Sequence, residues 1–186
     1  MNHWVRKYNR VSDKVCRDTI KELEDKEFTK HTFYNPTTNE TYSNDNELSI
    51  AWHETSTRPL LNDIVDKIAH QYIQGLSTPW FTSHNNYSYV RFNKYDVNTK
   101  MAVHCDHIHS VFKHENSGVP ILSVLGLLND DFEGGEFIIN SEKIDLQKGD
   151  LLVFPSNFMY PHEVMPITKG VRYSFISWIW WCTSFI

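Results

Sequence analysis

The sequence predicts a mainly β protein of the α+β class, in which a β-sandwich or jelly-roll core follows two helices. Three observations support this prediction. From residue 87 onward, short apolar runs alternate with turns rich in Gly, Asn and Asp. Aromatic residues make up 14% of the chain and concentrate in strand-like runs at 87–95 and 173–181. Two earlier segments repeat their apolar residues at helical spacing instead.

Both helices are predicted before the strands begin. The first covers residues 12–25, where Ser12 or Asp13 can cap the N-terminus and apolar residues recur on one face. The second has a cap at Ser56, a proline near its first turn, and a long apolar stripe that ends at Gly75. Both helices are expected to support the β core.

A polar stretch at residues 35–46 lies between the two predicted helices. Its Asn, Thr and Ser content indicates a turn-rich, exposed loop that could close over a ligand as a lid. The core strands are expected further along the chain. They are Ile121–Leu128, Glu136–Ile139, Leu151–Phe154 and Val171–Trp181, with turns at Asp130–Gly135 and Lys148–Asp150.

Length and charge limit the kind of protein this can be. A chain of 186 residues is expected to form one domain over 1–186, with a helical and loop part at about 1–86 and the jelly-roll core at about 87–182. The net charge of −5, without a Lys/Arg block, argues against a nucleic-acid partner. No signal-like or membrane-spanning apolar segment occurs, and three cysteines suit a reducing compartment. A cytoplasmic protein without a membrane partner is therefore expected.

The most informative motif is His104-Cys105-Asp106, which His162 follows much later in the chain. Alternate residues of a strand share one face, so His104 and Asp106 are expected to point the same way. Two histidines and one carboxylate can bind a metal from one side and leave its other positions open. This arrangement is typical of non-haem Fe(II) oxygenases. The three residues are therefore the candidate catalytic and metal-binding group.

Arg172 adds a cation ten residues after the second histidine. The alternation of the last strand places Ser174 on the same face, so both side chains could bind one carboxylate. A metal-chelating co-substrate with an outlying carboxylate would need such a group. The pattern therefore suggests 2-oxoglutarate as co-substrate beside Fe(II).

Other residues of similar chemistry have simpler interpretations. His107, His109 and His114 are expected to lie in a solvated loop rather than to bind metal. Cys105 is expected to act as a small apolar residue and not as a nucleophile. The glycine pair at 134–135 suits a tight turn better than a phosphate site, because no helix begins after it.

About half of the chain resembles the prolyl 4-hydroxylase-like family of 2-oxoglutarate/Fe(II) dioxygenases, with its motifs in the family's order. The matching segments are Arg91–Tyr95, His104–Asp106, Leu127–Asn129, Phe132–Phe137, Lys148–Phe154 and Pro161–Val164, followed by Arg172 and Trp178.

This resemblance implies a double-stranded β-helix, or jelly-roll, core with supporting N-terminal helices. It implies that His104, Asp106 and His162 bind Fe(II), and that Arg172 and Tyr95 contact 2-oxoglutarate. It also implies hydroxylation of a C–H bond with O2 as oxidant and release of succinate and CO2. Ascorbate is a further cofactor that the resemblance allows.

The resemblance leaves the substrate open. Peptide-prolyl hydroxylases usually have an arginine and then a tyrosine where this chain has Pro120 and Leu127. A prolyl residue in a peptide or protein is the first expectation, with Trp178 as a substrate-binding wall. The alternative is a free amino acid or small metabolite. Nucleic-acid demethylases of the superfamily resemble one another in a second arginine near the position of Trp178, which disfavours that substrate.

A protein without oxygenase activity is the remaining alternative. His107, His109 and Glu115, with Gly149 and Pro155, loosely imitate the pattern of cupin-like metal-binding proteins. The glutamate spacing differs from that pattern by one residue, and the second glycine is missing. A vestigial site within an interaction module is a further alternative, which the complete set of ligands disfavours.

Overall fold

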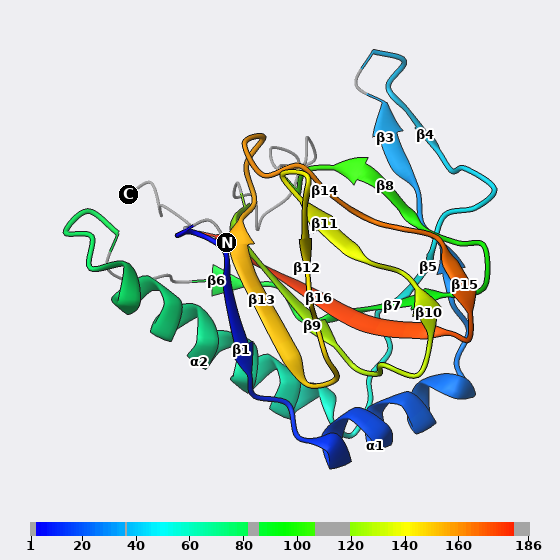
Figure 1. Ribbon diagram of the computed structural model, residues 1–186, viewed down its shortest axis with the longest axis horizontal. Coiled ribbons are helices and arrows are strands. Elements are labelled where there is room, and N and C mark those ends of the chain that lie inside the picture. The colour runs from blue at the N-terminus through cyan, green and yellow to red at the C-terminus, as the bar shows by residue number, and fades with distance from the viewer. Residues whose placement is uncertain (1–2, 36, 82–85, 107–119, 181–186) are drawn as a thin grey trace.

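The computed structural model describes residues 3–35, 37–81, 86–106 and 120–180 (Figure 1). Two helices are interspersed with short strands in the first part of the chain, and strands alone follow the second helix. In chain order the elements are β1 (Arg6–Asn9), α1 (Asp13–Glu24), β2 (Thr29–Lys30), β3 (Phe33–Asn35), β4 (Glu40–Tyr42), β5 (Ser49–Ala51), α2 (Arg58–Leu76), β6 (Asn86–Tyr87), β7 (Arg91–Tyr95), β8 (Met101–His104), β9 (Pro120–Leu127), β10 (Glu133–Gly134), β11 (Phe137–Ile139), β12 (Glu142–Ile144), β13 (Asp150–Pro155), β14 (His162–Val164), β15 (Ile167–Lys169) and β16 (Arg172–Trp180).

Two antiparallel sheets form the core. The large sheet has eight strands in the order β1-β13-β9-β16-β7-β5-β2, with β6 paired to β16. The small sheet has the order β12-β11-β14-β8. Buried apolar side chains from both sheets form one cluster, as jelly-roll packing requires. They include Tyr95, Leu125, Phe137, Phe154 and Ile176. The predicted jelly-roll fold is confirmed.

Both helices pack on the outer face of the large sheet (Figure 1). The second apolar cluster of the molecule joins α2 side chains such as Leu61 and Val65 to Phe92 of β7, Val124 of β9 and Phe175 of β16. The inner face of the large sheet therefore carries the first cluster and the polar side chains described below.

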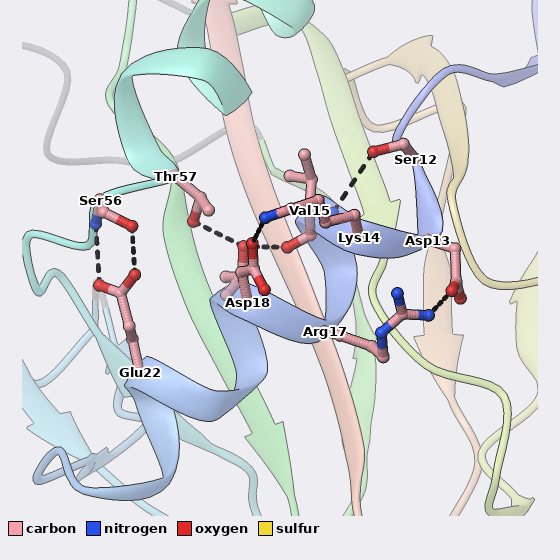
Figure 2. Close-up of polar contacts among 10 residues, drawn as sticks. Ser12, Asp13, Lys14, Val15, Arg17, Asp18, Glu22, Ser56 and Thr57 are labelled. Atoms are coloured by element: carbon pink, nitrogen blue, oxygen red, sulfur yellow. Dashed lines mark hydrogen bonds and ion pairs between the residues drawn. The ribbon is translucent and has the colours of Figure 1, made fainter.

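The two helix starts differ in how well they follow the predicted capping. Ser12 caps α1 by accepting a hydrogen bond from the Val15 amide at 3.3 Å. The prediction that Ser56 caps α2 is wrong, because the N-cap is Thr57 and its side chain makes no capping bond. Ser56 instead donates its amide and hydroxyl to the Glu22 carboxylate, which ties α1 to the start of α2 (Figure 2).

The N-terminal part adds three strands to the large sheet, and the sequence did not indicate their partners. β1 pairs with β13, and β5 lies between β2 and β7. Within the stretch 35–46, β4 pairs with β3 to form a hairpin, so part of the predicted loop is a strand. Such pairings depend on distant partners, which local sequence patterns do not specify.

The predicted core strands are confirmed with small differences at their ends. Segments 121–128, 151–154 and 171–181 correspond to β9, β13 and β16, and 136–139 corresponds to β11. These are the long apolar runs, where periodicity is most informative. In the part of the chain that the structure describes, neither helix is long and apolar enough to cross a membrane.

Candidate metal centre

The predicted metal ligands meet at one end of the small sheet. Strands β8 and β14 pair so that His104 lies opposite His162, and the two ring centroids are 4.3 Å apart. Asp106 follows two residues after the end of β8. One ligand atom from each of the three side chains lies within 4.8 Å of the others. Among the described residues, no other group of three His, Cys, Asp or Glu side chains lies so close together.

Backbone carbonyls orient both histidines. Nδ1 of His104 lies 2.8 Å from the Ala102 carbonyl oxygen, and Nδ1 of His162 lies 3.0 Å from that of Tyr160. A carbonyl can only accept, so each Nδ1 donates and each Nε2 carries a lone pair. The Nε2 atoms are 3.4 Å and 3.7 Å from the Asp106 carboxylate. Three electron-pair donors therefore face one point.

The Asp106 carboxylate accepts a hydrogen bond from a serine hydroxyl, which a second serine contacts in turn. Ser123 donates its hydroxyl to Oδ2 at 2.5 Å, and the hydroxyl oxygens of Ser123 and Ser156 are 2.8 Å apart. All three side chains are buried. Hydrogen bonds of this kind orient metal ligands in proteins. The arrangement therefore leaves Oδ1 less constrained than Oδ2.

The protonation states at the site also suit metal binding. Burial lowers the pKa of His162 to about 4, although the Asp106 charge opposes this shift. Burial raises the pKa of Asp106, but its interactions with His104 and His162 and the hydrogen bond from Ser123 outweigh burial, so the pKa lies below its usual value. At neutral pH, His162 is neutral and Asp106 is ionised. These are the forms that bind a metal.

A cavity between the two sheets contains all three candidate ligands. On the large-sheet side, β7 contributes alternate residues that share one face, Arg91, Asn93 and Tyr95. Apolar side chains form the rest of the wall: Met101, Leu125, Phe137, Phe154, Val164 and Ile176. A ligand in this cavity would therefore meet the three metal-binding atoms on one side and polar groups of β7 on the other.

Arg172 lies deep between the sheets, beside Tyr95. The two residues are register partners in β16 and β7, and the guanidinium carbon lies 4.9 Å from the Tyr95 ring centroid. The side chain of Arg172 is 1% exposed. Its Nη1 donates to the Ser174 hydroxyl at 3.0 Å, and burial lowers its pKa. Among the described residues, its Nε has no hydrogen-bond partner and no carboxylate pairs with its charge.

The predicted co-substrate residues are thus adjacent, but they do not line one cavity. Tyr95 lines the cavity of the metal ligands, whereas Arg172 lines a neighbouring hollow with Phe132, and Phe137 borders both. The Ser174 hydroxyl is engaged by Arg172 and is fully buried. Ser174 therefore holds the guanidinium in place in this structure.

Trp178 lies further along β16, beside Arg91. The Arg91 guanidinium carbon lies 5.0 Å from the Trp178 ring centroid. Trp52, which follows the end of β5, is half-exposed, and its ring centroid lies 6.5 Å from that of Trp178. Trp178 is 8% exposed, and its Nε1 has no partner among the described residues. Trp178 thus lies beside a residue of the metal cavity, and its role as a substrate-binding wall stays a prediction.

Several residues near the site were not identified from the sequence. Arg91 and Asn93 alternate with Tyr95, so the same parity argument could have found them. Trp52 and Phe33 gave no such indication, because they reach the site from separate short strands and loops. The ring of Phe33, in β3, lies 6.4 Å from that of His104, which brings the β3–β4 hairpin to the metal centre.

The residues present suit the predicted cofactors. Two neutral imidazole nitrogens and one carboxylate are the donor set of a facial Fe(II) site. A buried guanidinium without a carboxylate partner is costly, and an incoming carboxylate would satisfy it. The interpretation of His107, His109 and His114 concerns positions that lie outside the described residues.

Comparison with known proteins identifies the family. Residues 90–180 match the model of the 2OG-Fe(II) oxygenase superfamily. The chain is 34% identical over 96 residues to the PKHD-type hydroxylase YbiX of Shigella boydii, which is 47% of this chain and 41% of that protein. It is 42% identical over 53 residues to the PKHD-type hydroxylase IL0759 of Idiomarina loihiensis, which is 26% of this chain and 23% of that protein. This chain thus spans less than half of the length of either relative.

Solved structures with the same fold include three prolyl hydroxylases. A Trichoplax adhaerens prolyl hydroxylase, in complex with a hypoxia-inducible factor peptide, has a TM-score of 0.72 and 18% identity, covering 96% of this chain and 84% of that one. The collagen prolyl hydroxylase of Paramecium bursaria Chlorella virus-1, in complex with 2OG, has a TM-score of 0.70 and 13% identity, covering 98% of each chain. A Pseudomonas putida prolyl-4-hydroxylase has a TM-score of 0.69 and 17% identity, covering 96% and 94%.

The family predicted from the sequence is confirmed by these matches. Residues 90–180 match the 2OG-Fe(II) oxygenase superfamily, whose cofactors are Fe(II) and 2-oxoglutarate, and the His104–Asp106–His162 group could hold the iron.

Proposed function

We propose that this protein is a 2-oxoglutarate- and Fe(II)-dependent dioxygenase that hydroxylates a prolyl residue in a peptide or protein. One observation carries the proposal: the His–Asp–His group lines a cavity whose Tyr95 wall adjoins the buried Arg172, and among the described residues Arg172 has no carboxylate partner. Each would be costly to maintain without a ligand, and together they suit one metal and one dicarboxylate. The relatives named as hydroxylases support the reaction type.

In this proposal Nε2 of His104, the Asp106 carboxylate and Nε2 of His162 bind Fe(II). When bound, Fe(II) and 2-oxoglutarate supply the oxidation of a C–H bond to an alcohol, with O2 consumed and succinate and CO2 released. The Ala102 and Tyr160 carbonyls fix the two rings, and Ser123 fixes the carboxylate. The protein thereby holds the ligands on one side and leaves the other positions of the metal open.

Arg172 and Tyr95 form the co-substrate's distal contact in the same proposal. The guanidinium pairs with the outlying carboxylate of 2-oxoglutarate, and the Tyr95 hydroxyl assists. Ser174 positions the guanidinium by accepting from Nη1. Apolar side chains around the cavity keep water away from the reacting groups.

A prolyl substrate suits the aromatic surface at the edge of the site. Trp178 stacks on Arg91 of the metal cavity and contacts Trp52, and the β3–β4 hairpin lies beside His104 through Phe33. An extended peptide with a fixed proline φ loses little freedom on binding such a surface. The solved Trichoplax adhaerens relative binds a peptide, which supports this choice.

A free amino acid or small metabolite is the second candidate. Pro120 and Leu127 favour it, because these side chains provide no polar contacts where peptide-prolyl hydroxylases usually have an arginine and a tyrosine. Both residues are buried in β9. The substrate test must therefore include small molecules as well as peptides.

The decisive experiment is succinate formation from 2-oxoglutarate with Fe(II) and O2. Proline-containing peptides should stimulate it and gain about 16 Da, the mass of one oxygen atom. Matched peptides with alanine in place of proline should not. Stimulation by free proline or another amino acid, with every peptide inactive, would move the assignment to the second candidate. Absence of succinate with all of these compounds would refute the proposed function.

A further inference from the structure

Arg91 is a second arginine at the metal centre, and the functions proposed above do not use it. It begins β7 and lies on the same strand face as Asn93 and Tyr95, in the wall of the metal cavity. Its register partner on β16 is Ile176, four positions beyond Arg172. Arg91 therefore lies far along the strand from the co-substrate arginine, towards the side where Trp178 and Trp52 meet.

The contacts of Arg91 fix its orientation but leave its charge without a partner. Nε donates to Asn93 Oδ1 at 3.1 Å, and the guanidinium stacks on the Trp178 ring at 5.0 Å. Over the residues that the structure describes, neither terminal nitrogen has a hydrogen-bond acceptor or an ion-pair partner. A guanidinium that is stacked on a ring keeps the N–H groups at its edge available for a planar acceptor.

Asp106 does not serve as that partner. Its oxygens are occupied by Ser123, His104 and His162, and no ion pair with Arg91 lies within 4.0 Å. The Asp106 charge favours the cationic form of Arg91 from a distance, whereas burial lowers the pKa of Arg91. The carboxylate is thus committed to the metal site, and the arginine remains available.

Two further ring nitrogens in this part of the molecule have no partner in the described ranges of the chain. Trp178 Nε1 and His31 Nδ1 are buried and have no partner among the described residues. His31 is in ring contact with Phe33, which in turn contacts His104. The positive charge of Arg91 is one cause of the lowered pKa of His31, which shows that the two groups share one electrostatic environment. Among the described residues, no ion pair involves Arg91 or His31, so neither side chain has an anionic partner there.

A count of charges gives the same result. With the proposed ligands bound, the metal contributes two positive charges, each arginine contributes one, Asp106 contributes one negative charge, and the 2-oxoglutarate dianion contributes two. Among these groups one positive charge remains. The buried Glu47 carboxyl acts on Tyr95, nearer Arg172, and is not among the charges that act on Arg91, so the unpaired charge is that of Arg91, which is costly where it is shielded from water. The substrate is the component still to enter this site.

We infer that Arg91, stacked on Trp178, binds a carboxylate of the substrate. This inference rests on the proposed function, and it narrows the substrate to compounds that carry an anion close to the hydroxylated carbon. The carboxylate belongs either to a free amino acid or to an acidic side chain beside the target residue of a peptide. Arg91 is then a specificity-determining residue, distinct from the co-substrate arginine.

The test measures binding of matched probes by tryptophan fluorescence, with Mn(II) and 2-oxoglutarate present and O2 excluded. One pair of probes is a doubly capped peptide with Asp beside proline and the same peptide with Asn. The other pair is L-proline and L-prolinamide. The wild-type chain should bind the acid of at least one pair about ten-fold or more tightly, which corresponds to about 1.4 kcal/mol. The pair that shows the preference identifies the source of the carboxylate.

Arg91→Gln should abolish this preference, and Arg91→Lys should restore part of it, because lysine keeps the charge without the planar fork. Lys94→Gln is the matched control: it removes one positive charge from the opposite face of the same strand. That control should retain the preference. With an active substrate, Arg91→Gln should raise KM for the substrate and leave kcat and the KM for 2-oxoglutarate almost unchanged.

Equal affinity for acid and neutral probes in the wild-type chain, or binding of neither, would overturn the inference. A loss of 2-oxoglutarate affinity in Arg91→Gln would also overturn it, because Arg91 would then belong to the co-substrate site. The proposed function would fail differently, through absence of succinate with every compound. Because the probes are measured without turnover, the two failures can be told apart.

Discussion

Replacement of Arg172 by alanine tests the co-substrate site most sharply. The side chain is 1% exposed, and it donates to the Ser174 hydroxyl and to the neighbouring Tyr95 hydroxyl. A carboxylate that pairs with it is also removed from water, between the rings of Tyr95 and Phe132. Without the guanidinium, that carboxylate would remain buried and unpaired.

The expected magnitude follows from this geometry. Removing one partner of a buried, hydrogen-bonded charge pair costs about 2–5 kcal/mol. The Kd for 2-oxoglutarate should therefore rise by about 30-fold to 5,000-fold. Ser174→Ala should have a smaller effect, about 0.5–1.5 kcal/mol, because it removes one neutral hydrogen bond that only positions the arginine. Arg172→Lys should recover part of the affinity, since lysine cannot present two parallel donors.

Calorimetric titration of 2-oxoglutarate into the Mn(II)-loaded protein, without O2, gives these affinities. Mn(II) binding itself should survive in Arg172→Ala, because the arginine does not contact the three metal-binding side chains. Circular dichroism checks that the variant is folded. Wild-type affinity for 2-oxoglutarate in a folded Arg172→Ala variant would refute the role proposed for this residue.

Three further predictions concern stability and motion. Gly126→Ala should destabilise the fold by about 1–3 kcal/mol in urea unfolding, because a Cβ there would overlap the Phe175 ring; unchanged stability would contradict this packing. Burial, with Arg91 and His104 nearby, lowers the pKa of His31 to about 4. The contribution of neutral His31 to the free energy of unfolding is therefore complete above pH 6.5 and is lost as the pH falls towards 4. The metal-free protein should lose up to about 3 kcal/mol in this window, and His31→Leu should show a shallower loss than the wild type. The β3–β4 hairpin should become protected from proteolysis when peptide, 2-oxoglutarate and Mn(II) are all present, whereas equal cleavage rates would argue against closure.

The long apolar elements of this fold could be predicted from the sequence, and the strand partners could not. The helix Arg58–Leu76 and the strand Arg172–Trp180 have periodicities that local sequence specifies. β1 and β5 are short, and they join the large sheet only because β13 and β7 present free edges. Ser56 has the right chemistry for a cap, but Glu22, 34 residues away, competes for it.

The candidate site was predictable where one chemistry requires several residues together. His104, Asp106 and His162 were identified by ligand type and strand parity, and the structure brings their ligand atoms together. Parity also predicted that Arg172 and Ser174 share a face, but not that the hydroxyl would be used to hold the guanidinium. Residues such as Trp52 reach the site through tertiary packing, for which the sequence contains no local pattern.

Metal titration of single-residue variants tests the central claim most directly. The wild-type chain should bind one equivalent of Mn(II), which accepts the same ligands as Fe(II), and should form succinate when Fe(II) replaces it. Alanine variants of His104, Asp106 and His162 should each lose metal binding and succinate formation together. His70→Ala, which removes an exposed histidine of α2, should behave as the wild type. Retention of metal affinity and turnover by the Asp106→Ala variant would contradict the account.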